Sequence, residues 1–159
     1  MKIDIAVNGR FHMFDLAKEL NNKKCLNKII TTYPKWKVQE WGIVKDEINS
    51  IVFIEVLKRL KKYYPKKITP FFMLKQKELF DRISSRYISN SADIFVGLST
   101  NCLYSLKKAK SNNITTIVEC GSTHVLHQKK VFSREYKKCG VEYVPTHKGL
   151  ISRAIEEYS

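Results

Sequence analysis

The chain has 159 residues, of which 43% are hydrophobic and 11% aromatic, which suits one folded domain with a core and excludes an intrinsically disordered polypeptide. The net charge of +14 predicts a surface that attracts phosphates, whether of nucleic acid, anionic lipid or sugar nucleotide. No run approaches the roughly 20 apolar residues of a membrane span, and the amino terminus lacks a signal peptide's apolar core, so we expect a cytoplasmic protein.

The first third of the chain predicts a strand–helix–strand unit followed by a loop. Residues 2–7 form a short apolar run typical of a strand, and the apolar spacing across residues 13–20 predicts a helix. Residues 26–32 predict a second strand, joined to the first by a right-handed crossover. Residues 33–47 contain two tryptophans but no clear periodicity, so we expect a long loop there.

Two basic helices are predicted next. Helical spacing returns at Phe53, with Asn49 or Ser50 as the cap, and Thr69-Pro70 begins a second helix that runs to about Ser89. The apolar residues expected to be buried by the second helix are Phe72, Leu79, Ile83 and Tyr87.

Cationic side chains cluster in this helical region. They are Lys58, Arg59, Lys61, Lys62, Lys66 and Lys67. Two interpretations stay open, a solvated helical face and an interfacial surface that binds anionic membranes.

The second half alternates strands with helices. We expect strands at residues 92–98 and 114–118, and helices around residues 103–109, 131–136 and 151–158. Every residue from 114 to 118 is β-branched, which predicts a strand buried on both faces in the middle of a parallel sheet. Gly140 is expected to end the helix before it. The alternation predicts a single domain, residues 1–159, with an α/β three-layer Rossmann-like sandwich and a mainly parallel sheet.

The four cysteines carry little functional signal. They show no Cys-x-x-Cys spacing, which argues against a zinc site or a compact disulfide framework. We therefore expect buried, reduced thiols, with a nucleophilic Cys120 as the minor alternative.

The first predicted strand is followed by a short segment with three polar side chains: Asn8, Gly9, Arg10, Phe11 and His12. Ligands of open α/β sheets bind at this edge, and a helix N-terminus attracts anions. The spacing is neither a dinucleotide fingerprint nor a Walker A loop. The segment therefore predicts either a polar, anion-tolerant site or a simple tight turn.

A second polar cluster follows the strand at residues 114–118. Its members of interest are Glu119, Gly121, Ser122, Thr123 and His124. His124 could act as a general base or donate a hydrogen bond to a hydroxylated ligand; alternatively, it caps the turn. The spacing supplies no third metal ligand, so no metal site is predicted. Ser122 lacks the Gly-x-Ser-x-Gly context of a nucleophile.

Four short segments together resemble a known family. Residues 11–20 (Phe-His-Met-Phe-Asp-Leu-Ala-Lys-Glu-Leu) resemble the start of the glycosyltransferase family 4-like N-terminal domain. Residues 26–35 are similar to its second strand and the Thr-x-Tyr-Pro loop, residues 119–124 to its Glu-x-Gly-Ser-Ser-His segment, and residues 156–158 to its Glu-Glu-Tyr. The segments span nearly the whole chain in the family's order.

The resemblance implies the N-terminal half of a GT-B glycosyltransferase. This half would bind the sugar acceptor, and a C-terminal domain would bind the nucleotide sugar; transfer would proceed with retention and without a metal or other cofactor. The loop at Gly9 would lie near the donor sugar and its phosphates, and His124 near the reacting sugar. A basic helical region at residues 53–82 would dock the protein peripherally on the inner face of an anionic membrane.

The resemblance also sets an expectation about activity. The donor-binding half is not found in these 159 residues, so we expect no turnover by the chain alone. A partner chain or a further segment would supply it. The alternative function is a basic α/β binding module for nucleic acid or other phosphate-rich ligands, although no recognised RNA or DNA motif is present. A nucleotide- or NAD-dependent enzyme is disfavoured by the missing glycine fingerprint.

Overall fold

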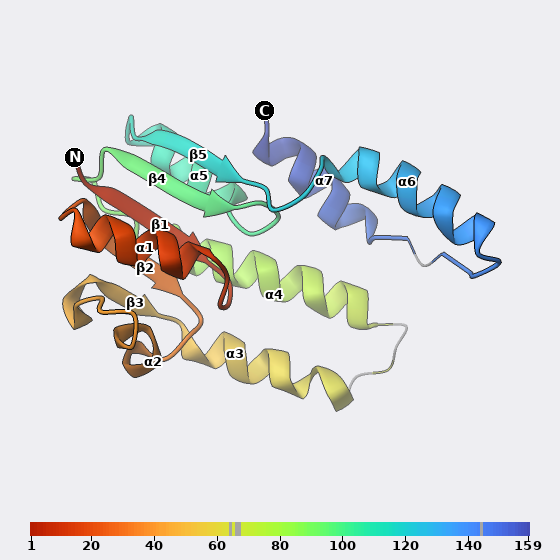
Figure 1. Ribbon diagram of the computed structural model, residues 1–159, viewed down its shortest axis with the longest axis horizontal. Helices are drawn as coiled ribbons and strands as arrows, with labels where there is room; N and C mark the ends of the chain where they lie inside the picture. Colours follow the sequence, from red (N-terminus) through yellow and green to blue (C-terminus); the bar gives the residue numbers. More distant parts are fainter. Residues whose placement is uncertain (64, 66–67, 144) are drawn as a thin grey trace.

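The structure is a computed structural model that describes residues 1–63, 65, 68–143 and 145–159, with only the backbone described at residues 61 and 62. Its strands form one sheet in the order β3-β2-β1-β4-β5, and all four pairings are parallel (Figure 1). The strands are β1 (Ile3–Val7), β2 (Leu26–Thr31), β3 (Ile48–Ser50), β4 (Ile94–Leu98) and β5 (Thr115–Glu119). The predicted α/β sandwich with a parallel sheet is confirmed.

Helices cover both faces of the sheet. They are α1 (Met13–Asn22), α2 (Lys35–Gln39), α3 (Val52–Arg59), α4 (Thr69–Ser84), α5 (Leu103–Ser111), α6 (Val125–Lys138) and α7 (Lys148–Glu157), with 3₁₀ turns at Lys45–Glu47 and Leu60–Tyr63. One core cluster joins the sheet to α1 and α2, and the other joins it to α3, α4 and α5. No helix in the described part of the chain is long and apolar enough to cross a membrane.

Strand β1 lies at the centre of the fold, because it pairs with β2 on one side and β4 on the other. Side chains alternate across a strand, so Ile5 enters one core cluster and Ala6 the other. Asp4 is fully buried in the same strand. Its carboxylate accepts hydrogen bonds from the backbone N–H of Ser89 (2.7 Å) and from Asn27 Nδ2 (2.6 Å), which offset part of the desolvation that raises its pKa.

The predicted central position of residues 114–118 is wrong. In the described sheet β5 is an edge strand that pairs with β4 alone, and its side chains are partly exposed, with Ile117 46% exposed. A β-branched run fits any pleated, half-buried surface, so it does not distinguish an edge strand from a central one.

The predicted loop at residues 33–47 is also wrong in part. It contains α2 and a 3₁₀ turn, and it leads into β3, whose three residues are too few to show an alternating pattern in the sequence. The Ser50 hydroxyl donates to the carbonyl oxygen of Tyr33, and Ile51 occupies the N-cap of α3, so neither proposed capping residue caps that helix.

Helix α4 ends at Ser84, earlier than predicted, and buries a different face. The inward residues are Leu74, Phe80, Asp81 and Ser84, whereas Leu79 and Tyr87 are exposed and Phe72 and Ile83 are half-buried. The spacing of apolar residues did not indicate the buried face of α4, because one of the buried side chains is the charged Asp81. Its carboxylate accepts the N–H groups of Tyr104 (2.7 Å) and Ser105 (2.9 Å) at the start of α5. These hydrogen bonds offset part of the cost of burying the carboxylate.

The predicted helix end at Gly140 is confirmed, whereas the prediction about the cysteines is not. Gly140 follows the end of α6 with φ +66°, as predicted. All four cysteines are free, but only Cys102 is buried; Cys25 is half-buried, and Cys120 and Cys139 are exposed. The expectation of uniformly buried thiols is therefore wrong.

The strand order places a topological switch between β1 and β4. The chain leaves β1 toward α1 on one face of the sheet and leaves β4 toward α5 on the other. Loops that diverge in this way open a crevice at the carboxyl ends of the two strands.

Candidate functional site

A cleft of about 510 Å³ lies at the carboxyl ends of β1, β4 and β5. Its walls come from the loops that follow these strands and from α4, α6 and α7. Of the residues predicted to bind substrate, His12, Glu119, Gly121, Ser122 and Thr123 line this cleft. Asn8 lines a neighbouring smaller cleft, and Gly9, Arg10 and His124 line neither.

His12 and Glu119 form the central polar contact of the cleft. The Nε2 atom of His12 contacts Oε1 of Glu119, although 107 residues separate them in the sequence. The two side chains are 53% and 32% exposed, so solvent and ligands can reach them. A carboxylate that holds one ring nitrogen fixes the orientation of the imidazole, and no described residue forms a hydrogen bond with Nδ1.

Gly9 and Arg10, which also follow β1, do not line the cleft. The guanidinium carbon of Arg10 lies 4.6 Å from the centroid of the Trp41 ring, a cation–π contact outside the cleft. Gly9 is buried with φ +117°, a conformation that glycine adopts readily, and its backbone approaches Lys58. The sequence pattern did not separate these structural roles from the ligand-facing position of His12.

The loop after β5 is braced by Gln128. Its amide nitrogen donates to the hydroxyl of Ser122 and to the carbonyl oxygen of Thr123, the latter at 3.0 Å. His124 is the N-cap of α6, where its Nδ1 accepts the N–H of Leu126 at 3.4 Å, and its ring centroid lies 5.7 Å from that of Tyr158. The geometry gives His124 a capping contact; a catalytic role stays a prediction.

The loop after β4 supplies a wall that the sequence analysis did not assign to the site. Ser99, Thr100 and Asn101 all line the cleft. Thr100 has φ +69°, an unusual conformation for a β-branched residue and one that the surrounding contacts must enforce. The rule that selected the residues after β5, polar side chains at the carboxyl end of a strand, could have found this loop as well.

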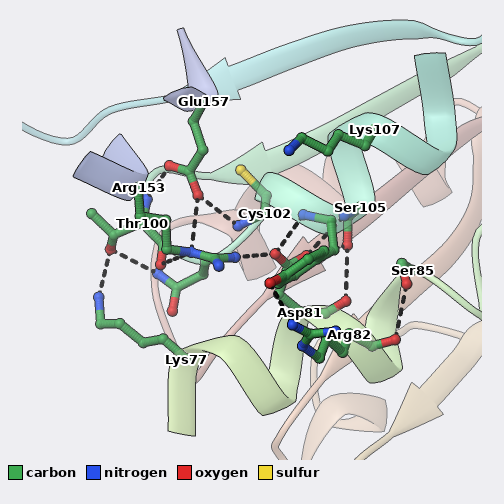
Figure 2. A network of polar contacts seen from close by, with 12 residues as sticks. Lys77, Asp81, Arg82, Ser85, Thr100, Cys102, Ser105, Lys107, Arg153 and Glu157 are labelled. Atoms are coloured by element: carbon green, nitrogen blue, oxygen red, sulfur yellow. Dashed lines mark hydrogen bonds and ion pairs between the residues drawn. The ribbon is translucent and has the colours of Figure 1, made fainter. Parts of the chain in front are cut away.

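Glu157 of α7 holds that loop in place. Its carboxylate accepts the N–H of Thr100, the N–H of Cys102 at 3.0 Å and the hydroxyl of Ser99 at 3.4 Å (Figure 2). Burial raises the pKa of Glu157, and the two backbone N–H groups counter that effect. Glu157 and Asp81 together therefore occupy N–H donors at the start of α5 that an anionic ligand would otherwise use.

Arg153 and Asp81 extend this network into the core. They form an ion pair in which both side chains are almost fully buried, and Arg153 Nε donates to the carbonyl oxygen of Thr100 at 3.1 Å (Figure 2). The pair joins α7 to α4 and fixes the floor of the cleft. No spacing in the sequence indicates this contact, because 72 residues separate its partners.

Lys77 of α4 brings a cation into the cleft. Its Nζ donates to the Thr100 hydroxyl, and Figure 2 shows the side chain reaching toward that residue. Burial is the main cause that lowers its pKa to about 8. No sequence pattern distinguishes Lys77 from the other members of a set of 29 lysines and arginines.

Cys120 and Tyr158 form a second titratable pair at the cleft wall. A hydrogen bond from the Tyr158 hydroxyl is the main cause that lowers the pKa of the Cys120 thiol. Both residues line the cleft, and Cys120 is exposed. The pair places a thiol with a lowered pKa in the wall of the cleft.

The predicted cationic surface is only partly described. Arg59 is exposed, whereas Lys58 is half-buried, donates to Thr32 Oγ1 at 3.3 Å and pairs with Glu55 at 3.2 Å. The side chains of Lys61 and Lys62, and all of Lys66 and Lys67, lie outside the described residues. Within the described part of the chain, no group of three or more His, Cys, Asp or Glu residues could hold a metal ion.

Comparisons with known proteins do not identify a family for this chain. No family model, curated protein or solved structure matches the chain.

Proposed function

We propose that this chain is the acceptor-binding half of a retaining GT-B glycosyltransferase, which moves a sugar from a nucleotide-sugar donor to an acceptor hydroxyl. The observation that carries the proposal is the cleft at the carboxyl edge of the parallel sheet, which is lined by the His12–Glu119 pair together with the hydroxyl-bearing residues Ser99, Thr100 and Ser122. Saccharides are recognised by such sets of hydrogen-bonding side chains. The resemblance of residues 11–20 and 119–124 to family 4-like enzymes points the same way.

In this proposal His12 positions the acceptor. Glu119 holds Nε2, so Nδ1 can accept a hydrogen bond from the acceptor hydroxyl. The carboxylate stabilises any positive charge that develops on the ring as the hydroxyl loses its proton. His124 contributes from the rim, because its Nδ1 is engaged by Leu126 and its Nε2–H stays available to a sugar oxygen.

The donor would bind to a second Rossmann-like domain supplied by another segment or a partner chain. Catalysis of sugar transfer requires stabilisation of the leaving diphosphate, which carries more charge than one lysine balances. Among the described residues that line the cleft, Lys77 is the one lysine or arginine. The 159 residues alone would therefore bind an acceptor without turning it over, and no metal would be needed.

A saccharide titration tests the proposal. The purified chain, labelled with ¹⁵N, is titrated with a panel of mono- and disaccharides, and we expect chemical-shift changes at Thr100, Gly121 and Ser122. A matched His12→Gln variant should lose most of the response. No response to any saccharide in the panel would overturn acceptor binding. Sugar transfer by the 159-residue chain without a partner would overturn the need for a second domain.

A peripheral membrane position is part of the same proposal. Apolar side chains on α3 and α4 are exposed beside Arg59, and Figure 1 shows the two helices side by side, extending beyond the sheet. The exposed residues are Val52, Phe53, Val56, Leu60, Ile68, Phe71 and Met73. A basic surface with exposed aromatic rings suits the interface of an anionic bilayer, which for this protein would be the inner face of the cytoplasmic membrane.

A second candidate function rests on α6. None of its 14 residues is buried, and its exposed cations include Lys129, Lys130, Arg134, Lys137 and Lys138. Such a helix could bind the phosphates of an RNA strand. Saturable, salt-dependent binding to RNA, but not to anionic liposomes, would favour this function over the glycosyltransferase.

A further inference from the structure

A smaller cleft of about 260 Å³ adjoins the main one. It is lined by Asn8, Lys58, Met73, Gln76 and Lys77. Lys77 lines both clefts, so the two clefts meet at this side chain. The described residues in the wall of the smaller cleft include two lysines and no carboxylate.

Lys77 lacks the anionic partner that a buried lysine normally has. Its one described hydrogen bond goes to the neutral Thr100 hydroxyl, and no carboxylate of the described residues forms an ion pair with it. An ammonium group carries three N–H donors, so two are left for a ligand or water. Desolvation without a paired charge is expensive, which is why the pKa falls to about 8.

The nearby carboxylates are already engaged. Asp81 is held by Arg153 and by the start of α5, and Glu157 is held by the N–H groups of Thr100 and Cys102. At longer range Glu157 raises the pKa of Lys77, whereas Arg153 and Lys58 lower it. No acid among these neighbours is free to turn toward Lys77. Because Glu157 and Asp81 occupy N–H groups at the start of α5, an incoming anion would meet Lys77 rather than that helix terminus.

Asn8, which lines the same smaller cleft, also has a polar atom without a described hydrogen-bond partner. The amide nitrogen of Asn101 donates to the carbonyl oxygen of Ser99 (3.0 Å) and to the Thr100 hydroxyl (3.3 Å), which fixes its Oδ1 as the acceptor for Asn8 Nδ2 at 3.1 Å. The remaining Oδ1 of Asn8 is buried and has no partner among the described residues. A buried acceptor of this kind is normally satisfied by an ordered water or a ligand hydroxyl.

We infer that the ligand of the main cleft is a phosphorylated sugar, whose phosphate enters the smaller cleft and is bound by Lys77. Lys58, which also pairs with Glu55 at 3.2 Å, is the second cation in the wall of that cleft. A hydroxyl of the ligand, or a water that it carries, donates to Asn8 Oδ1. The sugar part of this inference rests on the proposed function, whereas the phosphate site does not. The phosphate would supply the negative charge that no described carboxylate supplies to Lys77.

The experiment uses inorganic phosphate as the first probe, and then glucose 1-phosphate against glucose. Binding to the ¹⁵N-labelled 159-residue chain is followed by chemical shifts and calorimetry. We expect phosphate to bind with a dissociation constant on the order of millimolar, and Lys77→Met to weaken it at least about tenfold. Lys77→Arg should retain binding. The matched control is Lys75→Met, on the same helix, because Lys75 is 53% exposed and paired with Glu78.

The pH dependence gives a readout that a purely structural lysine would not show. Lys77 loses its charge above about pH 8, so phosphate affinity should fall by up to about tenfold per pH unit above that value. In Lys77→Met the residual affinity should show no such fall. Lys77→Met removes a desolvated charge and should fold at least as well as the parent, which circular dichroism can check.

The outcomes separate the two proposals. Phosphate binding that is lost in Lys77→Met and kept in Lys75→Met supports the phosphate site, whether or not any sugar binds. Glucose 1-phosphate binding no more tightly than glucose, or equal loss of phosphate binding in both variants, overturns it. If phosphate binds at Lys77 but no saccharide binds anywhere in the cleft, the proposed function fails and the anion site stands.

Discussion

His12, at the start of α1, contacts Glu119, at the end of β5, although β4 lies between their two strands. The contact closes over the carboxyl end of β4 and brings together the two polar clusters predicted from the sequence. If the pair positions an acceptor hydroxyl, Glu119→Gln should weaken saccharide binding about tenfold, because a neutral amide stabilises the bound imidazole less. Calorimetry on the parent and variant would measure this. Gln39→Glu, a charge change of the same size away from the cleft, should leave affinity unchanged.

Arg153→Met should destabilise the fold strongly. The substitution leaves the buried carboxylates of Asp81 and Glu157 without their guanidinium, and removing one partner of a buried pair costs about 3–5 kcal/mol. Urea unfolding followed by circular dichroism measures the free energy of unfolding. Arg134→Met is the control, because Arg134 is 65% exposed and its pair with Glu135 should contribute less than about 1 kcal/mol. Equal effects of the two substitutions would contradict the structural role of the Asp81–Arg153 pair.

Lys77 should make stability depend on pH in the alkaline range. Its folded-state pKa of about 8 lies below the ordinary 10.5, so between these values the unfolded chain binds more protons than the folded one. Stability therefore rises with pH across this window, by about 3 kcal/mol. Because cysteines and tyrosines also titrate here, the quantity to measure is the difference between the parent and Lys77→Met. A constant difference from pH 7.5 to 10.5 would show that the pKa of Lys77 is not lowered.

Gly97→Ala should destabilise the β4–α5 junction. A Cβ at Gly97 would lie 2.4 Å from Cβ of Cys102 and 2.8 Å from its Sγ, so the strand and the start of α5 would have to separate. Overpacking of this kind typically costs about 1–3 kcal/mol. The control is Gly121→Ala, which would meet nothing within 4 Å. Thermal unfolding compares the two, and an unchanged melting temperature for Gly97→Ala would contradict the close approach.

The exposed rings of α3 and α4 should control membrane binding. Phe53 and Phe71 are 49% and 51% exposed, and each ring inserted in a bilayer interface contributes about 1–2 kcal/mol. Phe53→Ser and Phe71→Ser should each reduce co-sedimentation with anionic liposomes about tenfold. Phe132→Ser is the matched control, since Phe132 is 48% exposed on α6. If Phe132→Ser gives the same loss, binding does not depend on the α3–α4 surface.

Much of the fold could be predicted from local pattern. The apolar run of β1, the helical spacing of α1 and the glycine after α6 each reflect interactions within a few residues, so they can be read without the tertiary structure. The alternation of strands and helices then restricts the sheet to a parallel one, because consecutive parallel strands need crossover helices. The polar residues at the ends of two strands were found for the same reason.

The tertiary structure decided which strand is central and what completes the site. Residues 114–118 have the composition of a buried strand but lie at the sheet edge, since position in a sheet depends on pairing partners and not on the strand's own side chains. Lys77, Asp81 and Glu157 appeared in the sequence as ordinary helical charges. They become a buried network because α4 and α7 converge on the loop after β4, and the burial of a charge is set by contacts distant in the sequence.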